Sequence, residues 1–101
     1  MIAVAKLKKY ESYNNLNYQD LEITHKEMWL RAKIVMQFVE LRETKGYTQQ
    51  DIADKIGTQR QQITRFENMS NSPTLLFLVK YATALETTID FLLKGVNIVE
   101  Y

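Results

Sequence analysis

The chain has 101 residues, 46% of them hydrophobic, and its 13 basic and 12 acidic side chains leave a formal net charge of +1. This length allows one small domain with an extension, and the absence of cysteine excludes disulfides and thiolate metal sites. The near-zero charge excludes a strong overall field for holding nucleic acid non-specifically, so any phosphate binding must come from local charges and helix ends.

In chain order, residues 1–28 are predicted to form an N-terminal extension, residues 29–95 a compact helical domain and residues 96–101 a C-terminal tail. Thr24, with Glu27 three residues later, has the spacing of a capping box that starts a long first helix. The extension therefore runs directly into the domain.

The first helix carries apolar residues on two opposite sides. At about 100° per residue, the stripe predicted to face the domain core is Leu30, Ile34, Phe38 and Leu41. The outer stripe, on the opposite side, is Trp29, Ala32, Met36 and Val39. Because a helix of a small bundle normally carries polar residues there, we expect the extension, a second subunit or another protein to cover it. The residues of the same chain that would do so are Tyr10, Tyr13, Leu16, Tyr18 and Leu21.

Residues 49–68, QQDIADKIGTQRQQITRFEN, have the pattern of two helices joined by one tight turn. Ala53 is small enough to let the helices approach closely, and Gly57 can adopt the left-handed conformation of the turn. Ile63 and Phe66 are spaced to fill the wedge between the helices. Such a pair of helices is the plan of a helix-turn-helix that reads DNA.

Capping boxes are predicted at both helix starts, after Gly46 has closed the first helix. One box pairs Thr48 with Asp51, and the other pairs Thr58 with Gln61. Helix starts direct backbone N–H groups outward, where they can bind phosphate oxygens. The alternative is a surface cap that binds no ligand.

The second helix of the pair is rich in long polar side chains. Those predicted to read base edges are Gln59, Arg60, Gln61, Thr64 and Arg65. Glutamine can bond to adenine and arginine to guanine in the major groove. The alternative is a merely solvated face, because glutamine and arginine are good helix formers, but the preceding turn favours base reading.

Two further helices are predicted. Ser72, Pro73 and Thr74 begin the fourth, with the proline in its first turn, where no hydrogen bond is lost. Its core residues are Leu75, Leu78, Ala82 and Leu85. Thr88 is predicted to cap a short last helix that runs through Leu93 and is ended by Gly95.

From about Leu41 to Gly95 the sequence resembles the DNA-binding domain of the phage Cro and cI repressors, the Xre family. The matching stretches are LRETKGYTQQDIADKIGTQRQQITRFEN, SPTLLFLVKYATAL and TTIDFLLKG, and the positions in register are Arg42, Gly46, Gln49, Ala53, Gly57, Ile63 and Glu67. The resemblance implies an all-α, five-helix lambda-repressor-like fold. It also implies a homodimer that binds a palindromic operator in double-stranded DNA and represses transcription.

The resemblance assigns roles to single residues. It implies phosphate contacts by Gln49 and Asn68, which join the helix-start residues, so that the predicted phosphate contacts are Thr48, Gln49, Thr58 and Asn68. Arg42 and Glu67 match a partly buried structural ion pair, which removes Arg42 from the DNA contacts. The segment Phe91, Leu92 and Leu93 matches the dimer contact of the related repressors.

An enzyme, a cofactor site and a metal site are not expected. His25 is the only histidine, and no motif brings a base near the serines. The three glycines already have helix-ending roles, which leaves no Gly-rich phosphate loop. No apolar run is long enough to span a bilayer, and the N-terminus lacks the order of a secretory signal, so we expect a cytoplasmic location.

An alternative function comes from the layout of the chain. An N-terminal extension that runs into a helix-turn-helix domain is similar to the layout of HigA-type antitoxins, which neutralise a ribonuclease toxin and repress their own operon. This resemblance is in organisation and not in a diagnostic motif. A neighbouring reading frame for a small, basic, ribonuclease-like protein would favour the antitoxin over the autonomous repressor.

Overall fold

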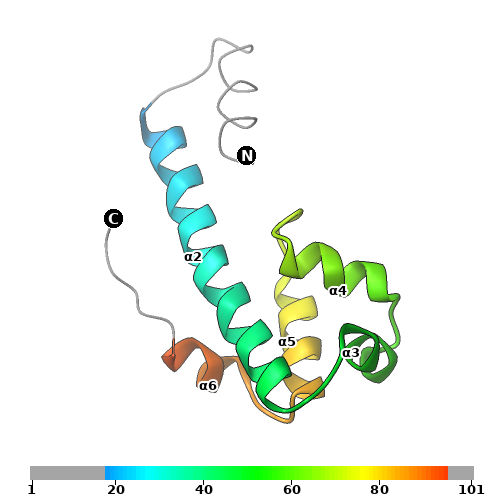
Figure 1. Ribbon diagram of the computed structural model, residues 1–101. Coiled ribbons are helices and arrows are strands. Elements are labelled where there is room, and N and C mark those ends of the chain that lie inside the picture. The colour runs from blue at the N-terminus through cyan, green and yellow to red at the C-terminus, as the bar shows by residue number, and fades with distance from the viewer. Residues whose placement is uncertain (1–17, 96–101) are drawn as a thin grey trace.

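The computed structural model of the chain describes residues 18–95, which form five helices and no strand. The helices are α2 (Tyr18–Thr44), α3 (Gln49–Ile56), α4 (Arg60–Glu67), α5 (Leu75–Ala84) and α6 (Ile89–Lys94). Figure 1 shows the short helices beside the C-terminal part of α2, whose N-terminal turns extend beyond them. The expected all-α, five-helix fold is thus confirmed. None of the helices described is long and apolar enough to cross a membrane.

α2 is one helix of 27 residues, and it begins earlier than predicted. Thr24 lies inside this helix and is not its N-cap, so the capping box with Glu27 was wrong. The predicted boundary between residues 28 and 29 also falls inside α2. Residues 18–44 contain neither glycine nor proline, so nothing in the sequence interrupts the helix. Residues 18–28 are therefore continuous with the domain.

The core face of α2 overlaps the predicted core stripe, with Phe38 buried as expected, but is shifted toward the outer stripe. Arg31, Val35 and Phe38 are its buried residues, while Ile34, Leu41 and Val39 border the core from either side. Leu30 was predicted to be buried and is 41% exposed. The buried strip of the helix is therefore displaced from the predicted core stripe toward the outer one.

The outer stripe of α2 is only partly covered. Val39 packs against the core, whereas the side chains of Trp29 and Met36 are exposed, Met36 at 64%. Leu21 belongs to α2 itself and Tyr18 begins it, so neither folds back from a separate segment. Tyr10, Tyr13 and Leu16 lie outside the described residues.

Aromatic rings from three helices form the centre of the core. The ring centroid of Phe38 lies 5.4 Å from that of Phe66 and 4.9 Å from that of Tyr81, both in edge-to-face geometry, which is the favourable arrangement for aromatic pairs. The other buried apolar residues are Val35, Ile52, Ala53, Ile63, Ala82, Ala84, Leu85 and Leu92. Residues from all five helices thus hold α3 and α4 at one fixed mutual angle.

The start of α5 differs from the prediction. Thr74 is the N-cap, and its hydroxyl accepts the amide N–H of Phe77 at 3.0 Å. Pro73 therefore precedes the helix and does not occupy its first turn. Leu75, at the first position, is 71% exposed because it lies beyond the edge of the core, so its assignment to the core was wrong.

The last helix begins as predicted, with the Thr88 hydroxyl accepting the amide N–H of Phe91 at 3.2 Å. Gly95 follows it with a right-handed backbone, φ −81°. A Cβ at this position would lie only 2.6 Å from Oε1 of Gln37 on α2. Because this atom ends a flexible side chain that can move aside, neither a left-handed turn nor the approach to α2 requires glycine at this position.

Candidate nucleic-acid interface

The turn between α3 and α4 has the predicted geometry. Gly57 has φ +72°, in the left-handed region that L side chains rarely adopt. Its amide donates to the carbonyl of Ala53, and so does the amide of Thr58, at 2.9 Å. Ala53 and Ile63 are fully buried at the contact between the helices. The two helices are thereby fixed across one short turn.

This turn also explains why the second capping box was wrong. Because the amide of Thr58 closes the end of α3, Thr58 belongs to that helix end and α4 begins two residues later, at Arg60. Gln59 is the N-cap, and its side chain makes no capping hydrogen bond. The amide of Thr58 is therefore already hydrogen-bonded to Ala53, and only the Thr58 hydroxyl remains for the predicted phosphate contact.

At the start of α3 the predicted capping box is confirmed. The Thr48 hydroxyl accepts the amide of Asp51 at 3.0 Å, and the Asp51 carboxylate accepts the amide of Thr48 at 2.8 Å. These hydrogen bonds to Thr48 lower the pKa of the exposed Asp51 carboxyl. The amide of Thr48 is therefore used by the cap, whereas its hydroxyl only accepts and keeps its proton for the predicted phosphate contact.

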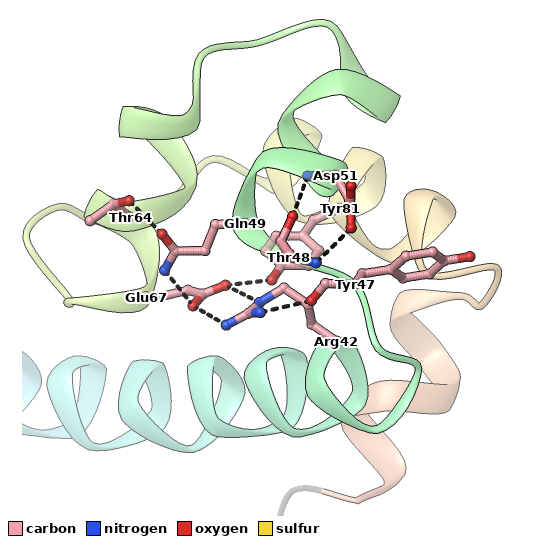
Figure 2. Close-up of polar contacts among 8 residues, drawn as sticks. All are labelled: Arg42, Tyr47, Thr48, Gln49, Asp51, Thr64, Glu67 and Tyr81. Carbon is pink, nitrogen blue, oxygen red and sulfur yellow. Dashed lines mark hydrogen bonds and ion pairs between the residues drawn. The ribbon is translucent and has the colours of Figure 1, made fainter.

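The ion pair implied for Arg42 and Glu67 is present and joins α2 to the end of α4 (Figure 2). Nε of Arg42 donates to Oε2 of Glu67 at 2.9 Å, and Nη2 donates to Oε1 at 3.0 Å. Nη1 donates to the backbone carbonyl of Tyr47 at 2.9 Å. The two side chains are only 11% and 7% exposed. Arg42 is therefore committed to the interior and unavailable to DNA.

Two further residues complete the surroundings of the Glu67 carboxylate (Figure 2). The phenol of Tyr81 donates to Oε2 at 2.6 Å, and Nε2 of Gln49 donates to Oε1 at 3.0 Å. Burial alone would raise the pKa of Glu67, but the hydrogen bonds from Arg42, Tyr81 and Gln49 outweigh it and hold the pKa below its ordinary value. Burial, together with the hydrogen bond to Glu67, raises the pKa of Tyr81. We call Arg42, Gln49, Thr64, Glu67 and Tyr81 the Glu67 network.

Thr64 and Gln49 meet within this network. The Thr64 hydroxyl donates to Oε1 of Gln49 at 2.8 Å. Thr64 is accordingly half-buried, and its hydroxyl proton points toward α3 instead of outward from the predicted base-reading face. Gln49 uses its amide oxygen and one N–H internally, which leaves one N–H for the predicted phosphate contact.

The remaining predicted base-reading residues are exposed. They are Gln59, Arg60, Gln61 and Arg65. Within residues 18–95, neither Arg60 nor Arg65 forms an ion pair. Asn68, just beyond α4, is also exposed, and in the same region its side chain makes no hydrogen bond. These groups are free to bind a ligand that accepts and donates hydrogen bonds.

Sequence reasoning missed Tyr81 and Arg31. Tyr81 is fully buried and supplies a donor to Glu67, and Arg31 is 4% exposed and reaches the loop after α4. A buried tyrosine needs a partner for its hydroxyl, but one sequence gives no sign of which carboxylate it meets. Among residues 18–95, no three His, Asp or Glu side chains lie close enough to hold a metal ion.

Comparison with known proteins agrees with this geometry. The family described as "Helix-turn-helix" matches residues 39–92. Two Bacillus subtilis (strain 168) proteins are similar to the chain: the SPbeta prophage-derived HTH-type transcriptional regulator YonR, 41% identical over 56 residues, and the HTH-type transcriptional regulator YqaE, 39% identical over 54 residues. The alignments cover 55% and 54% of this chain, and 52% and 47% of those proteins, so the chain matches about half the length of each. Because this match covers more than half of the chain, the chain belongs to the helix-turn-helix family of the Xre and Cro/cI type.

Proposed function

We propose that the protein is a sequence-specific DNA-binding transcription regulator, and that it represses transcription by occupying a palindromic operator in the cytoplasm. One observation carries this proposal: α4 presents Gln61 and Arg65 on its exposed side while its inner side is fixed by the buried Glu67 network. A rigid helix with unpaired amide and guanidinium groups matches the hydrogen-bonding pattern of base edges in the major groove.

The charge distribution supports specific over non-specific binding. With a net charge of +1, the chain has no strong overall positive field, so base contacts and local phosphate contacts must supply the affinity. The N-terminus of α3 contributes the free N–H of Gln49, and Asn68 lies at the far end of α4. Contacts at both ends would orient α4 in the groove without reading sequence.

A homodimer on a palindrome is part of the proposal because α6 exposes large apolar side chains. Phe91 is 64% exposed and Leu93 is 39% exposed, whereas Leu92 is buried in the core. Phe91 and Leu93 are therefore the available part of the implied dimer contact, and Leu92 is not. A two-fold dimer would present two copies of α4 about one turn of DNA apart.

The test is selection of binding sites from random duplexes, followed by titration of the selected site. Arg65→Ala and Gln61→Ala should each weaken specific binding by about 1–3 kcal/mol. The matched control is Gln62→Ala, because Gln62 is on the same helix but lines a hollow with Phe66 and Asn71. Selection of no site, or equal losses for all three variants, would contradict the proposal.

The antitoxin is kept as a second candidate because of the exposed Trp29 and Met36 on α2. A ribonuclease toxin bound there would cover the apolar surface that the described residues leave open. Trp29→Ser with Met36→Ser should then abolish toxin binding and leave operator binding unchanged. The matched control is Leu76→Ser, at an exposed leucine on α5. Toxin binding that survives the double substitution would contradict this candidate.

A further inference from the structure

Arg31 is a charged residue of α2 that is almost completely buried, with 4% of its surface exposed. Its Nη1 donates a 2.7 Å hydrogen bond to the backbone carbonyl of Asn71, in the loop between α4 and α5. Its Nη2 donates to Oε1 of Glu27 at 3.1 Å, and its Nε lies 3.1 Å from Oε2 of the same carboxylate. The hydroxyl of Ser72 donates to Glu27 at 3.4 Å. Two residues of α2 therefore hold two consecutive residues of the loop.

The same loop is tied to the recognition helix by backbone hydrogen bonds. The amide of Ser70 donates to the carbonyl of Arg65 at 2.9 Å, and the amide of Met69 donates to the carbonyl of Phe66 at 3.1 Å. Met69 has φ +60°, a left-handed conformation that costs energy for a side chain of this kind. Something must hold the chain in this turn, and the Arg31 bond one residue beyond Ser70 restrains it from the outside.

We propose that Arg31 is a positioning residue for DNA binding: through the Asn71 carbonyl it fixes the loop that sets the C-terminal end of α4. This inference rests on the proposed function. Arg65 and Asn68 both lie in the last turn of α4 or directly after it. Their placement in the groove then depends on a contact from α2, more than one helical turn away from the Arg42–Glu67 pair.

The choice of arginine supports a positioning role. For stability alone, an apolar side chain of similar size serves as well as a buried ion pair, because the ions lose their hydration. A charge-assisted hydrogen bond to a backbone carbonyl instead fixes the position of the main chain. Arg31 and Glu27 also precede the family match, which begins at residue 39. The N-terminal half of α2 thus contributes to DNA binding from outside the matched motif.

The experiment compares two full-length variants. Arg31→Met keeps an unbranched side chain of similar length, so folding is expected to persist, but it removes the bond to Asn71. Val35→Ala, one turn along α2, removes buried methyl groups without touching the loop. Affinity for a selected operator is measured at a temperature where wild type and both variants are fully folded. Amide hydrogen exchange of Ser70 is measured on the free proteins.

Arg31→Met should weaken operator binding about tenfold, the factor that corresponds to one lost hydrogen bond of a charged group. It should also speed exchange at Ser70 relative to the amides of α3. Val35→Ala should melt at a lower temperature yet bind the operator within about twofold of wild type. Arg31→Lys, which can still donate one bond to Asn71, should recover part of the affinity.

Operator affinity that Arg31→Met leaves unchanged would overturn the proposal, as would an equal loss in Val35→Ala. Unchanged exchange at Ser70 would overturn it as well, because the loop would then not depend on Arg31. Exchange is measured without DNA, so it distinguishes this failure from failure of the proposed function. If wild type binds no selected duplex, the proposed function is wrong, and faster exchange in Arg31→Met then identifies a purely structural brace.

Discussion

The phenol of Tyr81 donates a 2.6 Å hydrogen bond to Oε2 of Glu67, the same oxygen that receives Nε of Arg42. Gln49 donates to the other oxygen, so the side chains of Arg42, Tyr81 and Gln49 together satisfy one buried carboxylate. A buried charge is tolerated only when it is paired and hydrogen-bonded. The end of α4 is therefore anchored by a group that each neighbour helps to keep ionised.

Tyr81→Phe should lower the free energy of unfolding by about 1.5–3 kcal/mol, the usual contribution of a hydrogen bond to a charged group. The ring still fills the core, so the loss reports the hydroxyl alone. Chemical denaturation measures it. Tyr47→Phe is the control, because its exposed hydroxyl is 3.4 Å from Glu86 and should contribute little. Equal stability of wild type and Tyr81→Phe would mean that the hydroxyl does not support Glu67.

Acid should destabilise the protein through Glu67. The pKa of Glu67 is held below its unfolded value of 4.5, so the folded state favours the ionised form. The resulting stability is fully present above pH 4.5 and is lost as the pH falls through the folded pKa. Unfolding curves between pH 7 and pH 3 should show this loss.

Glu67→Gln separates this effect from that of other carboxyls. The pKa of Asp51 is also lowered, so part of the acid sensitivity belongs to the Thr48 capping box. The variant should be less stable than wild type at pH 7, with a smaller loss of stability on acidification. An unchanged slope against pH would assign the acid sensitivity elsewhere.

The helix-turn-helix was predictable because its constraints are local. The left-handed turn favours a glycine, which Gly57 supplies. Ala53, Ile63 and Phe66 meet at fixed offsets along the chain. The cap at Thr48 follows the same logic, whereas Thr58 was misjudged because two helix ends compete for it. Local spacing cannot say which helix end takes a shared residue.

Contacts between distant residues were harder to predict. The Arg31 bond to Asn71 spans 40 positions, and nothing in a helical stripe distinguishes a buried arginine from a solvated one. The core face of α2 was predicted correctly at Phe38 and incorrectly at Leu30, for a related reason. Apolar residues occur on two sides of the helix, and only the packed neighbours decide that Val35 is buried and Leu30 is not.

Asn68→Ala should weaken binding to selected and unrelated duplexes by similar factors, because a phosphate contact positions the protein without reading sequence. Thermal stability should stay near that of wild type, since the side chain is exposed. Titration of both duplexes measures the ratio. A loss confined to the selected site would assign Asn68 to base reading.

Gln49→Ala should behave differently from Asn68→Ala. Gln49 bonds both Glu67 and Thr64, so its removal leaves part of the network unsatisfied. We expect lower stability together with weaker binding to all duplexes. Thermal melting alongside the titration separates the two effects, and an unchanged melting temperature would show that Gln49 acts only at the DNA.

The last prediction concerns Glu86, which follows α5 with φ +63°, a conformation that is strained for any residue with a Cβ. Glu86→Gly should relieve this strain. It also removes the exposed 3.4 Å pair with Lys45, which contributes about 0–1 kcal/mol. Glu86→Ala removes the same pair but keeps the strain. Relief of the left-handed strain favours glycine, and the larger entropy of glycine in the unfolded chain offsets part of this gain, so we expect the glycine variant to exceed the alanine variant by about 1 kcal/mol in the free energy of unfolding. Equal stabilities of the two variants would show that the strain relieved at this turn is no larger than the entropic cost of glycine.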